Sequence, residues 1–149
     1  MVIAGEWSRE EDGLFRPMVE ICALTTGRET AFEPFLVDTG ADCTVFSARL
    51  LAKLALPRDA LLAGSVLQGL GGRSGSVVIG ATLVFGTADG RTGNVAGNYL
   101  ATPEPTALDL SVLGRDVLDN FDVIVSRRRN EVLLIIGNDT YAVAGTPTT

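Results

Sequence analysis

The sequence predicts a mainly β protein: one small, closed or nearly closed β structure with two short helices. The 149-residue chain breaks into many short apolar segments rich in Val, Leu and Thr, and 17 glycines are spread among them. This pattern favours short strands joined by turns. No part of the chain shows the strand–helix alternation of βαβ units. We therefore expect a sheet that closes on itself rather than a layered α/β domain.

The expected strands follow one another along most of the chain. The first places Val19, Ile21 and Ala23 on one face, the alternation of a half-buried strand. Pro34 in the second indicates an edge or an irregular point. The expected strands are residues 17–24, 31–37, 44–46, 66–68, 76–79, 81–85, 92–100, 121–125, 131–136 and 140–143.

Two helices interrupt these strands. Ser47 can cap the first, expected over residues 48–56 and ended by Pro57. Residues 110–118 lead into the second. The apolar face of the first helix is formed by Leu50, Leu51 and Leu54.

Length and composition indicate one folded domain. Hydrophobic residues make up 46% of the chain and charged residues 20%, which is typical of a globular protein. Residues 1–16 are polar and acidic, and we expect a loosely held arm there. The folded domain is expected over residues 17–144 and a polar tail over 145–149.

Charge and residue types exclude several function classes. The net charge is −6, which disfavours nucleic acid as the main partner. The one basic run, Arg127, Arg128 and Arg129, is interpreted as a solvated turn. The chain has no histidine, which argues against His/Cys zinc sites and excludes triads with a histidine base. Among hydrolytic mechanisms, those that use carboxylates remain possible for this chain.

The two cysteines, Cys22 and Cys43, are expected to be free thiols in a reducing compartment. The first residues show neither the basic region nor the apolar core of a signal peptide. No stretch approaches the roughly 20 apolar residues that span a membrane. We therefore expect a soluble, cytoplasmic protein without a membrane partner.

The most informative feature is the tripeptide Asp38-Thr39-Gly40. It follows the apolar segment 35–37, so a carboxylate is placed on a tight turn after a strand. Thr39 can hydrogen-bond locally, and Gly40 permits a close backbone approach or a positive φ. Such a turn can hold an acid at the floor of a cleft. The tripeptide occurs only once in the chain.

Three segments in order resemble the retropepsin family of aspartic proteases. They are residues 37–42 (Val-Asp-Thr-Gly-Ala-Asp), 68–72 (Gln-Gly-Leu-Gly-Gly) and 112–116 (Val-Leu-Gly-Arg-Asp). The resemblance covers about residues 18–136 and implies a small closed β-barrel-like acid protease fold with a glycine-rich flap hairpin. The helix after the Asp38 turn and the hairpin after the late helix are more similar to cellular or bacterial members than to viral ones. Viral members interleave their chain termini at the dimer interface, so the construction of an interface here stays open.

The resemblance also implies an activity and a set of site residues. It implies an aspartic endopeptidase that acts on a peptide or protein substrate, without metal or cofactor, as a homodimer in which each subunit supplies one Asp38. Asp42 and Arg115 are expected to form a partly buried ion pair beneath the active-site turn. The residues implied are catalytic Asp38, the turn residues Thr39 and Gly40, and the substrate-binding residues Asp42, Leu67, Gly69, Leu70 and Gly71.

Two other interpretations fit parts of the sequence. A catalytically inactive retropepsin-like domain would use the same surfaces for peptide binding or dimerisation. An unrelated β-barrel would bind a small ligand. The intact Asp38-Thr39-Gly40 turn favours the protease, because an inactive domain has no need of the acid.

Overall fold

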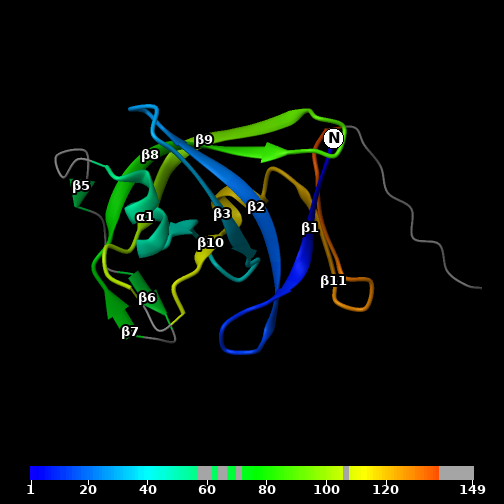
Figure 1. Cartoon of the computed structure of the whole chain (residues 1–149), viewed down its shortest axis with the longest axis horizontal. Coiled ribbons are helices and arrows are strands. Elements are labelled where there is room, and N and C mark those ends of the chain that lie inside the picture. Colours follow the sequence, from blue (N-terminus) through cyan, green and yellow to red (C-terminus); the bar gives the residue numbers. More distant parts are fainter. Residues whose placement is uncertain (57–61, 64–66, 70–71, 106–107, 138–149) are drawn as a thin grey trace, which may run out of the picture.

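The computed structural model describes residues 1–56, 62–63, 67–69, 72–105 and 108–137, and its main feature is a closed β-barrel (Figure 1). The ring of strands runs β2-β3-β10-β4-β9-β8, and pairing of β8 with β2 closes it. The expected fold class, mainly β with two short helices, is confirmed. The ring consists of β2 (Phe15–Thr25), β3 (Thr30–Val37), β10 (Ser111–Leu113), β4 (Val45–Phe46), β9 (Thr92–Ala101) and β8 (Val77–Gly86).

Further strands extend the sheet on both sides of the ring. On one side β1 continues from β2, and β12 and β11 follow it; on the other, β5 pairs with β8. β6 and β7 form a separate two-stranded hairpin. The bounds are β1 (Val2–Arg9), β5 (Leu62–Ala63), β6 (Leu67–Gly69), β7 (Gly72–Ser74), β11 (Asp122–Ser126) and β12 (Glu131–Ile135), with helices α1 (Ala48–Leu54) and α2 (Arg115–Leu118).

The N-terminal residues are a strand, so the expectation of a loosely held arm over residues 1–16 is wrong. β1 pairs with β12 through its first half and with β2 through its second half. Ile3 is only 1% exposed. A side chain at Gly5 would lie 2.1 Å from the Met18 carbonyl oxygen, so glycine allows the two strands to cross closely. The acidic residues of this segment made it read as polar, so the few apolar side chains that face inward were not recognised as a strand.

Other boundaries differ less from expectation. Residues 76–79 and 81–85 belong to one long strand, β8. β3 is one of the ring strands, but β10 pairs only with the last three residues of β3. Pro34 therefore lies where β3 has a strand on one side, as its missing N–H requires. The C-terminal hairpin of β11 and β12 is confirmed; the strand expected over residues 140–143 lies outside the described residues.

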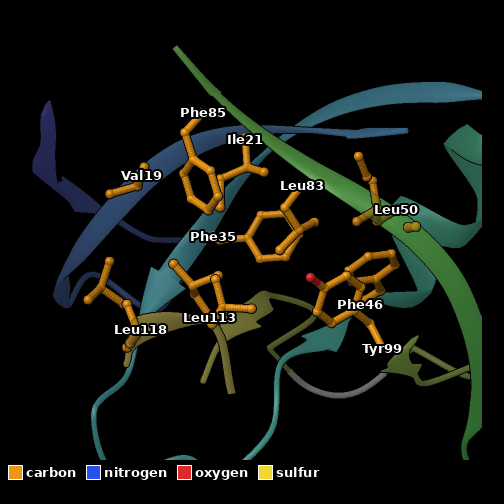
Figure 2. Close-up of a cluster of buried hydrophobic side chains, with 14 of the residues drawn as sticks. Val19, Ile21, Phe35, Phe46, Leu50, Leu83, Phe85, Tyr99, Leu113 and Leu118 are labelled. Atoms are coloured by element: carbon orange, nitrogen blue, oxygen red, sulfur yellow. The ribbon is translucent and has the colours of Figure 1, made fainter. Parts of the chain in front are cut away.

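The barrel core is filled by aliphatic and aromatic side chains that include residues of the ring strands and of both helices (Figure 2). Phe35 of β3 meets Phe46 edge to face, with ring centres 5.7 Å apart. Phe46 also stacks on Tyr99, with ring centres 5.5 Å apart. Such pairs are stabilising beyond the apolar area that they bury. They fix β3, which leads directly into the Asp38 turn, against β4 and β9.

One inward-facing residue of β3 is an acid. Glu33 is fully buried, and its Oε1 accepts the hydroxyls of Ser47 at 2.6 Å and Ser111 at 3.0 Å. Its Oε2 lies 3.5 Å from Arg49 Nε and 3.5 Å from Lys53 Nζ, both on α1. A buried carboxylate needs such partners. The cluster ties β3, β10 and α1 together near the Asp38 turn.

Helix α1 begins as its sequence predicts. Ser47 Oγ accepts the Leu50 N–H at 2.9 Å, which is the expected cap. The Asp109 carboxylate adds two bonds, from the N–H groups of Ala48 and Arg49, each 2.9 Å long. The helix ends at Leu54, two residues earlier than expected, because Ala55 takes a left-handed conformation with φ 48°.

Candidate active site

Asp38 lies directly after β3, where the chain leaves the barrel. Its N–H donates to the Leu113 carbonyl at 3.2 Å, which fixes the residue to the end of β10. Its own carbonyl accepts the Ala41 N–H at 3.2 Å, which closes the turn. Carboxylate Oδ1 accepts the Gly40 N–H at 2.9 Å. The residue is half-buried, and its Oδ2 forms no hydrogen bond with another described residue, so this oxygen is available for chemistry.

Thr39 and Gly40 are both exposed at the tip of the turn. The backbone of Gly40 is not left-handed, so glycine is required here for space rather than for φ. A side chain at this position would lie 3.2 Å from Asp38 Oδ1, a tight contact. Glycine thus leaves the Asp38 carboxylate undisturbed while its N–H orients that carboxylate.

The residues after the turn are held by the start of α2. The Arg115 N–H donates to the Ala41 carbonyl at 2.9 Å, and the Asp116 N–H donates to the Asp42 carbonyl at 3.2 Å. A side chain at Gly114 would lie 2.4 Å from the Cys43 carbonyl carbon. Only glycine allows the two backbones to approach this closely. The first and third motifs of the sequence therefore meet backbone to backbone.

Thr44 forms the centre of this contact, although sequence patterns did not single it out. It is fully buried. Its hydroxyl donates to Asp116 Oδ1 at 2.7 Å and accepts the Gly114 N–H at 3.0 Å. Its own N–H also donates to Asp116 Oδ1, at 2.9 Å. No local signal could have found this pairing, because 72 residues separate Thr44 from Asp116.

Asp42 and Arg115 form an ion pair between Oδ1 and Nη2. The hydrogen bond from the guanidinium to Asp42 raises the pKa of Arg115. The side chains are 76% and 55% exposed, so the expectation of partial burial is wrong. The reason is that both residues project from the outer side of the contact between turn and helix, while Thr44 and Gly114 occupy its interior. Water and salt screen such a pair.

The glycine-rich segment forms a tighter hairpin than the sequence suggested. β6 pairs with β7 in the register Leu67 to Ser74 and Gly69 to Gly72. The second arm is therefore residues 72–74 rather than 76–79. Of the expected substrate-binding residues, Leu67 and Gly69 lie in β6, while Leu70 and Gly71 lie outside the described residues. Figure 1 shows this hairpin at the lower edge of the view, the edge toward which β3 runs.

The described residues around this turn give little support to metal-dependent or thiol-dependent chemistry. Among the described residues, no three His, Cys, Asp or Glu side chains are grouped so that they could hold a metal ion. Cys22 and Cys43 are free thiols; Cys43 is exposed, and burial raises the pKa of the Cys22 thiol. The chemically distinctive group in this part of the described chain is the Asp38 carboxylate.

A carboxylate on an Asp-Thr-Gly turn, held by a Gly-Arg helix start at the mouth of a small β-barrel, defines an aspartic protease fold. The family model for the retroviral aspartyl protease matches residues 15–126. The chain belongs to this family, and the resemblance seen in its sequence is confirmed. A comparison with curated proteins finds no match.

A solved structure of a bacterial protein shows the same fold. A retropepsin-like aspartic protease from Rickettsia conorii aligns with a TM-score of 0.58 at 19% sequence identity, covering 90% of this chain and 98% of that one. The EIAV protease in complex with an inhibitor aligns with a TM-score of 0.48 at 22% identity, covering 70% of this chain and 86% of that one. The alignment with the bacterial protein covers a larger share of the chain than the residues 15–126 matched by the family model.

Within the described residues, no helix is both long and apolar enough to traverse a lipid bilayer.

Proposed function

We propose that this chain is an aspartic endopeptidase whose catalytic dyad is formed by Asp38 from two subunits of a homodimer. The observation that carries the proposal is the Asp38 turn: a half-buried carboxylate, oriented by the Gly40 N–H, with one oxygen left for chemistry. Peptide hydrolysis by carboxylates needs two such groups close together. The chain has one Asp-Thr-Gly turn, so a second copy supplies the other.

The two carboxylates share one proton, because like charges at close range cannot both ionise easily. The ionised carboxylate removes a proton from a water molecule, and the water oxygen attacks the scissile carbonyl carbon. The protonated partner gives its proton to the carbonyl oxygen. When the tetrahedral intermediate collapses, the C–N bond breaks and the leaving nitrogen takes the proton that the first carboxylate removed from water. One hydroxyl of the intermediate returns its proton to the second carboxylate, so the dyad again holds one proton. The reaction needs no metal or cofactor.

The substrate is an extended peptide bound as an added strand between the Asp38 turn and the β6–β7 hairpin. The backbone of Gly40 and Asp42 holds its main chain. The flap segment with Gly69, Leu70 and Gly71 closes over it, and Leu67 and Leu70 favour apolar residues beside the scissile bond. The fixed backbone of the turn supports this role.

The test is cleavage of a peptide library at several acidic pH values by wild-type protein, Asp38→Asn and Asp122→Asn. Asp122 is an exposed acid at the start of β11 and serves as the matched control. We expect Asp38→Asn to abolish cleavage and Asp122→Asn to leave it unchanged. The specific activity of the wild type should also fall on dilution below the dimer dissociation constant. Wild-type cleavage by a folded Asp38→Asn protein, or by a species shown to be monomeric, would contradict the proposal.

A further inference from the structure

Two hairpin tips lie at the same end of the barrel as Asp38. In the β1–β2 hairpin, Trp7 pairs with Pro17, and on the other side of β2, Met18 pairs with Leu36. The end of β3 therefore lies level with Trp7 and Pro17, and the tip of the β1–β2 hairpin extends beyond it in the same direction. Figure 1 shows this tip in blue and the β11–β12 turn in orange, both toward the lower edge of the view.

The two tips contact each other within one chain. The guanidinium carbon of Arg127, in the β11–β12 turn, lies 4.1 Å from the ring centre of Phe15 and 5.7 Å from that of Trp7. This is a cation–π contact. The backbone N–H of Trp7 also donates to Asn130 Oδ1 at 3.3 Å. The two tips thus form one continuous surface, which we call the hairpin face: residues 9–16 and 125–130.

The hairpin face carries charges of both signs. The β1–β2 tip has Glu10 and Glu11, and the other tip has Arg128 and Arg129. None of these four forms an ion pair with another described residue, in contrast to Asp12, which pairs with Arg16. Both arginines and Glu11 are exposed. With Asp12 and Arg16 paired, Arg9 offsets one of the two glutamates, so the β1–β2 tip keeps one net negative charge and lies next to the basic tip.

The same face is unusually apolar. Five large apolar side chains are exposed in the described part of the chain, and three of them lie in the hairpin face. They are Leu14 at 60%, Phe15 at 46% and Val125 at 41% exposure. Apolar surface gathered among charges is typical of a contact with another protein.

We propose that the hairpin face is the surface through which two copies of this chain associate. Around a two-fold axis, the acidic tip of each copy meets the basic tip of its partner, and Leu14, Phe15 and Val125 lie between these contacts. A surface with adjacent acidic and basic sites is complementary to itself, which a two-fold interface requires. The proposal rests on the proposed function, since that function requires a second Asp38 at this end of the barrel.

The N-terminal strand β1 could form the contact between two copies only if it first separated from its neighbouring strands. β1 already has β12 and β2 as its neighbours, and β12 lies between β1 and β11. The Met1 ammonium also donates to the Ile136 carbonyl at 2.9 Å. Exchange of β1 between subunits would break these bonds, whereas the hairpin face is already formed in one copy.

Charge reversal tests the interface directly. Arg128→Glu/Arg129→Glu makes both tips acidic, and Glu10→Arg/Glu11→Arg makes both basic; Arg127 is kept because it packs on Phe15. Arg28→Glu and Glu20→Arg reverse charges outside the hairpin face and serve as controls. Association of the full chain is measured by sedimentation over a range of protein concentrations, and folding by circular dichroism.

We expect each double variant to raise the dimer dissociation constant about tenfold or more, because like charges then face each other. The controls should stay within about threefold of wild type. An equimolar mixture of the two double variants should form a heterodimer with near-wild-type affinity, since every contact then joins opposite charges. Higher salt should weaken the wild-type dimer, because exposed charges are screened.

Three results would overturn the proposal. The first is dimerisation of both folded double variants with wild-type affinity; the second is a mixture that associates no better than its components. A wild type that stays monomeric but shifts a labelled oligonucleotide through Arg128 and Arg129 would replace the second copy by nucleic acid and also overturn it. Cleavage assays on the same samples separate the two ideas. Dimers that ignore charge reversal but still cleave peptides contradict only the interface, and dimers that respond to it without cleaving contradict only the protease.

Discussion

Replacement of Thr44 by valine tests whether the buried hydroxyl holds the Asp38 turn to α2. The change keeps the size of the side chain but removes the only oxygen that accepts the Gly114 N–H and one of the donors to Asp116. An unsatisfied buried donor costs about 1–3 kcal/mol, and the lost bond from the hydroxyl to Asp116 adds about 1 kcal/mol. We therefore expect the free energy of unfolding to fall by about 2–4 kcal/mol.

The assay is urea and thermal unfolding at one fixed protein concentration, because association shifts apparent stability. For a chain of this size each kcal/mol lowers Tm by about 2–4 °C, so the expected loss is roughly 5–15 °C. Thr44→Ser retains the hydroxyl and should recover most of the stability. Thr92→Val, at an exposed position of β9, is the matched control and should change stability by less than about 0.5 kcal/mol. If Thr44→Val unfolds like this control, the hydroxyl does not hold the turn.

Two further outcomes follow from the charges and the buried phenol. Because the Asp42–Arg115 pair is exposed, Arg115→Ala should reduce the free energy of unfolding only slightly. The coupling energy in a double-mutant cycle with Asp42→Ala should fall in high salt. A strong coupling energy that does not change with salt would refute the exposed geometry. Burial, with a smaller contribution from Asp116, raises the pKa of Tyr99 to about 12. The neutral phenol is thus favoured in the folded state, so its stabilisation is full below the unfolded-state pKa near 10 and is lost as pH rises toward 12. Unfolding curves across this range should show that loss in wild type and less of it in Tyr99→Phe; equal slopes would contradict it.

Local signals in the sequence were sufficient for much of the fold. The apolar segment before Asp38 is β3, Ser47 caps α1, and the arginine run turns the chain between β11 and β12. Each of these features depends on residues within a few positions of one another. The same locality explains the error at the N-terminus. β1 is stabilised by β12, more than 120 residues away, and its own segment reads as polar.

The candidate site was predictable only in part, for a related reason. The position of Asp38 is apparent from its tripeptide, and the family resemblance connects it to Arg115. The residues that carry the connection in the structure are Thr44 and Asp116, whose pairing has no periodicity or spacing to indicate it. Glu33 was missed in the same way, because its hydroxyl partners lie 14 and 78 residues away. Burial of the Asp42–Arg115 ion pair was expected because the flanking segments are apolar. In the structure both side chains instead point to solvent from the outer side of the contact between the turn and α2.

The Asp38 turn is held by bonds within its own chain: to Leu113 of β10, to Arg115 and Asp116 of α2, and through Thr44. In the homodimer proposed above, each subunit would therefore contribute an Asp38 turn that is already ordered before association. Recovery of activity after a concentration jump should then follow second-order association without a later, concentration-independent lag. Compounds that block the proposed association would act on a surface that is already present in the single chain.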